Sequence, residues 1–90
     1  MALSVSSSVI ATVIGEAIEA DRKYGEFSSA HEAYGVLAEE MLELLEAIRR
    51  NDPFGIRDEA TDVAAVAARL ADACQSAIDR ETDFGHRSGF

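Results

Sequence analysis

The sequence predicts an all-α protein, and two observations carry this prediction. Apolar residues recur with a helical period along the 90-residue chain, and no stretch shows the sustained alternation typical of a half-buried strand. The dipeptides Asn-Gly and Asp-Gly, which favour two-residue hairpin turns, are absent from the sequence. The predicted architecture is an antiparallel helical hairpin preceded by an N-terminal helix, which forms a four-helix-bundle-like core by oligomerisation.

The first predicted helix runs from about Ser6 to Tyr24. Gly25 is expected to end it, because glycine readily adopts the left-handed conformation found after many helices. The predicted apolar face of this helix consists of Ile10, Val13, Ile14, Ala17 and Ile18.

The second predicted helix covers His31 to Arg50 and starts with the pattern S-x-x-E at Ser29 and Glu32. In such a capping box the serine and glutamate side chains each satisfy a backbone N–H that has no partner at the helix start. Arg49 and Arg50 suit the negative end of the helix dipole. The predicted core stripe consists of Tyr34, Leu37, Ala38, Met41, Leu44, Leu45 and Ile48.

Residues 51–55, Asn-Asp-Pro-Phe-Gly, carry turn chemistry, and so short a turn predicts an antiparallel hairpin. The third helix then runs to about Arg80. Its alanine-rich part, 60–73, suits close helix packing, a subunit interface, or both. Residues 1–82 are therefore expected to form one helical domain, followed by a tail, 83–90, without periodicity. The apolar face of the third helix consists of Ile56, Val63, Val66, Leu70, Cys74 and Ala77.

Composition limits the partners and the setting. A chain of 90 residues is near the lower limit for burying an adequate core alone, so self-association is expected. The net charge of -9 disfavours a nucleic-acid polymer or an anionic membrane as partner. No run approaches the roughly 20 apolar residues that span a bilayer, and the N-terminus lacks the basic start of a signal peptide. The single cysteine, Cys74, cannot form an internal disulfide, so a reducing, cytoplasmic location is expected.

Five carboxylates form the pattern E-E-x-x-E, then fifteen residues, then E-x-x-D. They are Glu39, Glu40, Glu43, Glu59 and Asp62. Residues three apart on a helix share a face, so Glu40 pairs with Glu43, and Glu59 pairs with Asp62. Glu59 projects into the apolar stripe of its helix, Glu40 borders its own stripe, and Glu39 points away. Because a bare buried carboxylate is costly, the converging pairs predict a bound cation.

The all-carboxylate donor set is hard, so it selects Mg²⁺, with Mn²⁺ or Ca²⁺ as alternatives, over Zn²⁺ or Cu²⁺. A di-iron site is disfavoured because the chain has no Glu-x-x-His motif. Mg²⁺ sites usually combine a few carboxylates with waters and substrate phosphates. The acidic cluster therefore favours phosphate chemistry.

Residues 35–48, G-V-L-A-E-E-M-L-E-L-L-E-A-I, with 57–63, R-D-E-A-T-D-V, resemble the MazG-like all-α nucleoside triphosphate pyrophosphohydrolases. The segment 20–25, A-D-R-K-Y-G, also resembles the approach to the second helix in small, phage-type members. The resemblance covers about residues 15–75. It implies Mg²⁺-dependent cleavage of a nucleoside triphosphate into a monophosphate and pyrophosphate, with a role in clearing the nucleotide pool. It also implies a homodimer or homotetramer whose sites draw on more than one subunit.

The resemblance assigns residue roles by position. Glu40, Glu43, Glu59 and Asp62 would be the metal ligands, and Glu39 would lie in the outer shell, bind a further metal or help the attacking water. Arg22, Lys23 and Arg69 are candidates for binding the polyphosphate, or else solvated surface charges. Phe27, Tyr34 and Phe54 are candidates for contacting the base, although Tyr34 also fits the core, and His31 is expected to be a surface or capping residue.

A second function remains open at this point. The chain is alternatively a noncatalytic adaptor or oligomerisation module, in which the carboxylates form an acidic surface or a structural metal site. The place of Glu59 on the apolar stripe disfavours this alternative, because a simple acidic face would keep all its charges in solvent.

Overall fold

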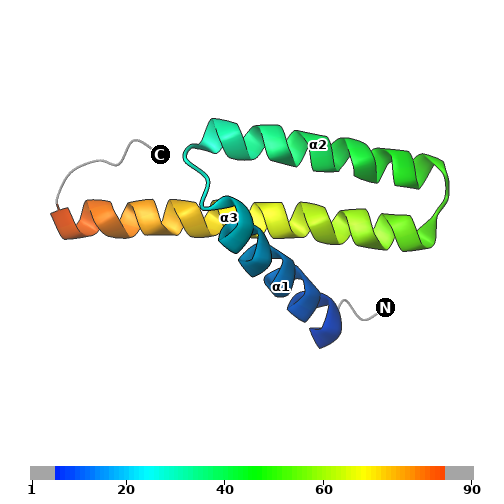
Figure 1. The fold of residues 1–90 in the computed structure, drawn as a ribbon, viewed down its shortest axis with the longest axis horizontal. Helices are drawn as coiled ribbons and strands as arrows, with labels where there is room; N and C mark the ends of the chain where they lie inside the picture. Colours follow the sequence, from blue (N-terminus) through cyan, green and yellow to red (C-terminus); the bar gives the residue numbers. More distant parts are fainter. Residues whose placement is uncertain (1–5, 85–90) are drawn as a thin grey trace, which may run out of the picture.

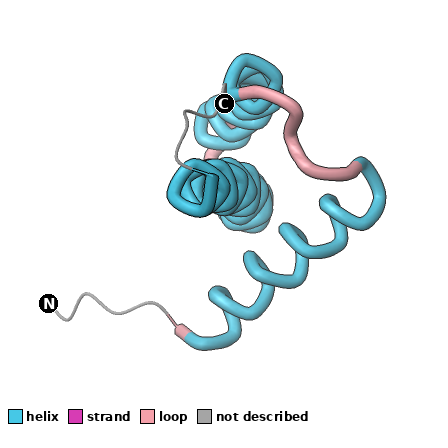
Figure 2. The backbone as a smooth tube through the Cα atoms, turned by 90° about the vertical axis from the view of Figure 1, so that its left-hand side faces the viewer, coloured by secondary structure: helices cyan, strands magenta, loops and turns pink. Residues whose placement is uncertain are grey.

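A computed structural model describes the backbone of residues 6–84 and the side chains of residues 6–81. Three helices make up this part of the chain: α1 (Ser7–Tyr24), α2 (Ala30–Arg49) and α3 (Pro53–Phe84). Helices α2 and α3 lie side by side and antiparallel, and α1 crosses α3 obliquely (Figures 1 and 2). Within residues 6–84, α1 packs against α3 and not against α2. No strand occurs in the described residues, so the all-α prediction is confirmed for them.

Local signals place the ends of α1 and the start of α2 close to the predicted positions. Ser6 caps α1 by accepting a hydrogen bond from the backbone N–H of Val9, and Gly25 ends the helix with φ of 79°. The capping box at Ser29 differs from the prediction in one bond. Ser29 Oγ accepts from the Glu32 N–H at 3.1 Å, but the Glu32 carboxylate accepts from the Ser28 hydroxyl at 2.9 Å rather than from the Ser29 backbone.

The connection from α2 to α3 is shorter than the predicted turn. Asn51 has a φ of 53°, and its N–H donates to the carbonyl of Ile48, while the Asp52 N–H donates to the carbonyl of Ala47. This pair of bonds is the Schellman arrangement that ends many helices. Only residues 50–52 separate the two helices.

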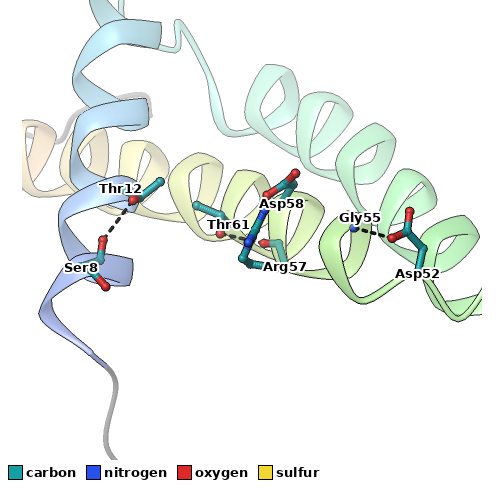
Figure 3. A network of polar contacts seen from close by, with 7 residues as sticks. All are labelled: Ser8, Thr12, Asp52, Gly55, Arg57, Asp58 and Thr61. Atoms are coloured by element: carbon teal, nitrogen blue, oxygen red, sulfur yellow. Dashed lines mark hydrogen bonds and ion pairs between the residues drawn. The ribbon is translucent and has the colours of Figure 1, made fainter.

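Asp52 also begins the next helix. Its Oδ1 accepts a hydrogen bond from the Gly55 N–H at 3.0 Å (Figure 3), and Pro53 occupies the first helical position, where no N–H is needed. A Cβ at Gly55 would lie 2.6 Å from Asp52 Oδ2, so a larger residue here would have to displace the capping carboxylate. α3 then extends to Phe84, two residues into the predicted tail; 85–90 lie outside the described residues.

The face that α2 turns towards α3 is displaced by about one residue from the predicted stripe. We call this face the inner strip; it consists of the buried or half-buried residues Ala33, Val36, Leu37, Glu40, Leu44 and Ala47. Most of the predicted core stripe lies exposed beside it. We call this exposed set the outer strip; it consists of Tyr34, Ala38, Met41, Leu45 and Ile48.

Helix α1 shows the same displacement. The large residues Ile10, Ile14 and Ile18 are about half exposed, at 46, 53 and 57%. The half-buried residues that face α3 are instead Val13, Glu16, Ala17 and Ala20. The buried apolar side chains of the described chain are Phe27, Val66 and five alanines. No helix in the described part is both long enough and apolar enough to cross a membrane.

Candidate metal centre

Three carboxylates from two helices meet between α2 and α3. One oxygen each from Glu40, Glu43 and Glu59 lies within 4.8 Å of the others. Glu40 and Glu43 are one turn apart on α2, and Glu59 comes from α3, which runs antiparallel beside it. The short connection at 50–52 brings these parts of the two helices to the same level. Three of the four predicted ligands therefore form one group.

Two oxygens of this group are shielded from solvent and have no hydrogen-bond partner, namely Glu40 Oε2 and Glu59 Oε2. Such atoms are costly, because burial removes water and nothing in the protein replaces it. Both residues are half-buried at the contact between the helices. Hard oxygen donors held this close, with lone pairs unused, fit a divalent cation of the Mg²⁺ or Mn²⁺ type.

The electrostatics of the group are unfavourable for the bare protein. Burial raises the pKa of the Glu40 carboxyl, and the negative charges of Glu43, Asp62 and Glu59 raise it further. Burial likewise raises the pKa of Glu59, with contributions from Glu43 and Asp62. The anionic forms, which a cation requires, are therefore the forms that the protein alone stabilises least.

Asp62, the fourth predicted ligand, lies next to this group rather than within it. Burial raises the pKa of both Glu59 and Glu16, and in each case the neighbouring Asp62 carboxyl raises it further. Glu16 belongs to α1, so the row of acids continues from the hairpin onto the crossing helix. Burial, together with Asp62, Asp58 and Glu40, raises the pKa of Glu16 to about 7.

Glu16 is the site residue that sequence reasoning missed. The predicted face of α1 included Val13 and Ala17, which are half-buried, but it was centred on the isoleucines, which are exposed. Glu16 lies on the side of Val13, Ala17 and Ala20. Ala20, which the predicted face left out, permits a close approach of two helices on that side.

A cleft opens between α1 and the hairpin beside these acids, with a volume of about 580 Å³. We call it the main cleft. Glu39 lies on its wall, so the residue expected to point away from the core faces this space. Glu16, Glu40 and Asp62 reach the cleft as well, whereas Glu43 and Glu59 do not line it. The other lining residues are Ala20, Tyr24, Gly25, Phe27, Glu32, Val36, Ala65, Val66 and Arg69.

Arg69, a predicted phosphate-binding residue, lines the main cleft but is already engaged within the chain. Its Nε donates to Asp21 Oδ1 at 2.7 Å, and its Nη2 donates to the carbonyl of Gly25 at 3.1 Å. The buried guanidinium also lies over the Phe27 ring, 4.2 Å from its centroid. Arg69 therefore joins the end of α1 to α3, and Phe27 is a core residue beneath it.

The other predicted substrate-binding residues lie on the surface and outside the main cleft. Arg22 pairs with Glu19 at 3.4 Å, and Lys23 lies 5.2 Å from the centroid of the Tyr24 ring. Tyr34 and Phe54 are both exposed, as is His31. Tyr24, which was not among the predicted base contacts, lies on the wall of the main cleft.

The family model of the MazG nucleotide pyrophosphohydrolase domain matches residues 29–85, well over half of the chain. The chain belongs to this family. The MazG match contains α2, the turn and α3, and with them the five acids of the E-E-x-x-E and E-x-x-D patterns. Helix α1, which carries Glu16, lies outside the match.

Membership of the MazG family makes the chain a relative of hydrolases that act on nucleotides. No curated protein and no solved structure matches this MazG domain.

Proposed function

We propose that this MazG domain hydrolyses a nucleoside triphosphate, of the ribo or deoxy series, to the monophosphate and pyrophosphate. The observation that carries the proposal is the pair of buried carboxylate oxygens of Glu40 and Glu59 without a hydrogen-bond partner, on a group of three acids from two helices. Their chemistry calls for a hard divalent cation, and family membership supplies the nucleotide as the class of substrate.

Glu40, Glu43, Glu59 and Asp62 would hold Mg²⁺, with Mn²⁺ as a substitute. When bound, such an ion polarises phosphoryl oxygens and lowers the pKa of a bound water, which is the chemistry that cleavage of a phosphoanhydride needs. Glu39 faces the main cleft, where it can accept a proton from a water or bind a further cation. These carboxylates keep their positions because each sits on a helix rather than on a loop.

The main cleft is the proposed place for the nucleotide. Its volume of about 580 Å³ falls within the roughly 300–1,000 Å³ typical of small-molecule sites. Its wall contains acidic residues, among them Glu40 and Asp62, and apolar residues, among them Val36 and Val66. A triphosphate would be repelled by the acidic residues unless cations neutralise them, which makes binding depend on the metal.

We further propose that the active form is a homodimer or homotetramer with a four-helix-bundle-like core. The outer strip of α2 exposes a row of large apolar side chains, whereas the buried core of the described residues is small. Exposed apolar surface of this kind usually marks an interface. A second copy that covers the outer strip would add the core that one chain lacks.

The experiment measures pyrophosphate release from a panel of ribo- and deoxynucleoside triphosphates with Mg²⁺, and again with Mn²⁺. Glu59→Gln is expected to lose at least about a hundredfold in kcat, because it removes a metal ligand from α3. Glu46→Gln, an exposed change on α2, serves as the matched control and should keep full activity. A folded, metal-loaded protein that releases no pyrophosphate from any substrate would contradict the proposal and favour the noncatalytic adaptor.

A further inference from the structure

Glu16 stands between two clefts at the crossing of α1 and α3. It lines the main cleft together with Glu40 and Asp62. It also lines a second cleft, which we call the small cleft, of about 350 Å³. Figure 3 shows this second region, where Thr12 of α1 lies near Thr61 of α3. The small cleft is lined by Ser8, Val9, Thr12, Glu16, Arg57, Asp58 and Thr61.

No cationic side chain that lines either cleft is paired with Glu16. Arg57, the cation of the small cleft, binds Asp58 at 3.0 Å. Arg69, the cation of the main cleft, binds Asp21 at 2.7 Å and the Gly25 carbonyl. Glu16 instead shares the wall of the main cleft with Asp62, a second carboxyl group. Neighbouring carboxylates repel each other when both are ionised, and a shared proton or a shared cation relieves this repulsion.

The neighbouring group gives an independent reason to choose the cation. Asp62 lies one helical turn after Glu59 on α3, and Glu59 Oε2 is buried without a partner. Glu40, whose Oε2 is the second orphaned oxygen, lines the main cleft together with Glu16 and Asp62. A cation that satisfies these oxygens would lie beside the acidic wall to which Glu16 belongs.

We propose that Glu16 is a further ligand of the divalent metal centre, contributed by α1 from outside the matched MazG domain, together with Asp62. This inference rests on the proposed function, because it assumes that the acids of the hairpin hold a divalent ion. It adds a ligand that the E-E-x-x-E and E-x-x-D patterns do not contain. It also makes the position of α1 depend partly on the metal, because within residues 6–84 the helix α1 packs on α3 and not on α2, with Arg69 as a further tie.

The test measures the dissociation constant of Mn²⁺, without nucleotide, by electron paramagnetic resonance of the free ion. Glu16→Gln keeps the shape of the side chain and removes its charge, and it is expected to weaken Mn²⁺ binding at least about tenfold. Glu19→Gln is the matched control on the same helix, because Glu19 is exposed and paired with Arg22. That control should stay within about twofold of the wild type.

Circular dichroism shows whether Glu16→Gln is folded. A second variant keeps the proposal testable if Glu16→Gln fails to fold. Glu16→Asp keeps the charge but withdraws the carboxylate by one methylene, so Mn²⁺ binding should again weaken, by less than in Glu16→Gln. Unchanged affinity in folded Glu16→Gln, alongside loss of binding in Glu59→Gln, would overturn the role of Glu16 and leave the proposed function intact. Absence of Mn²⁺ binding in the wild type would overturn both.

Discussion

The guanidinium of Arg69 lies over the ring of Phe27, 4.2 Å from its centroid, at the point where the loop after α1 meets α3. The same side chain binds Asp21 and the carbonyl of Gly25, so a single residue holds the end of α1, the following loop and α3 together. A guanidinium can do this because its planar fork donates in several directions while its face stacks on an aromatic ring.

Replacing this group should destabilise the protein. Arg69→Lys keeps the charge but cannot make both hydrogen bonds and the stacking contact, so unfolding should become easier by about 2 kcal/mol. Urea denaturation at fixed protein concentration measures the change. The matched control is Arg22→Lys, whose exposed pair with Glu19 should contribute less than about 0.5 kcal/mol. Equal effects of the two substitutions would contradict the bridging role of Arg69.

The metal-free protein should lose stability as the pH rises from about 4.5 to about 7. The folded state raises the pKa of Glu16 from 4.5 to about 7, so within this window it binds more protons than the unfolded chain. Stability from the protonated form is present below the lower value and is lost as the pH passes the higher one. Glu40 and Glu59, whose pKa values are also raised, act in the same direction.

The melting temperature of chelated protein, measured across this window, checks the sign. Glu16→Gln removes one of the titrating groups and should flatten the decline without abolishing it. A decline of the same steepness in wild type and variant would show that Glu16 does not contribute.

Divalent cations should stabilise the folded protein more than ionic strength alone does. Mg²⁺ or Mn²⁺ at 100 times its dissociation constant should contribute about 2.7 kcal/mol, provided that it binds the folded state only. Salt also relieves repulsion among the acids by screening, so NaCl at matched ionic strength is the necessary comparison. The difference between the two melting temperatures should vanish in Glu59→Gln, and a persistent difference there would place the ion elsewhere.

A charge on the outer strip should block assembly. Met41→Glu puts a carboxylate in the middle of the exposed apolar row, where it costs a separate chain little but cannot be buried against a second copy. Sedimentation velocity should then show a monomer or an unfolded chain in place of an oligomer. Gly35→Glu adds the same charge at a place that faces open space and should leave the association state unchanged. An unaltered oligomer in Met41→Glu would exclude the outer strip as the interface.

The helices and the acids could be predicted from the sequence because both depend on local rules. Ser29 marks a helix start and Gly25 a helix end by their own chemistry, and the spacing of Glu40 and Glu43 sets a shared face whatever the helix packs against. The rotation of α1 and α2 was harder to predict, whereas every residue of the predicted apolar face of α3 is buried or half-buried. Large apolar residues dominated the predicted stripe of α2, but Ala33 and Ala47 are the residues that this helix buries.

This rotation explains why Glu16 was missed and why Glu40 was placed only at a border. The apolar residues of an amphipathic helix can pack within one chain or against a second chain. The sequence pattern does not show which residues do which. Met41 and Leu45 are left exposed, while Glu40 lies on the inner strip beside them. The role expected for Arg69 was likewise altered by tertiary contacts, because its partner Asp21 lies far away in sequence.

The distances of the acids from the three-residue connection at 50–52 limit where residues can be inserted in this chain. Glu43 lies about two helical turns before the connection, and Glu59 lies about two turns after it. Because the helices are antiparallel, these equal distances place the two acids at the same level. Surface loops commonly accept extra residues. One extra residue within the helical turns on either side of the connection would instead rotate Glu43 or Glu59 by about 100° about its helix axis and separate the two acids. Insertions in these turns should therefore be selected against as strictly as substitutions of the acids.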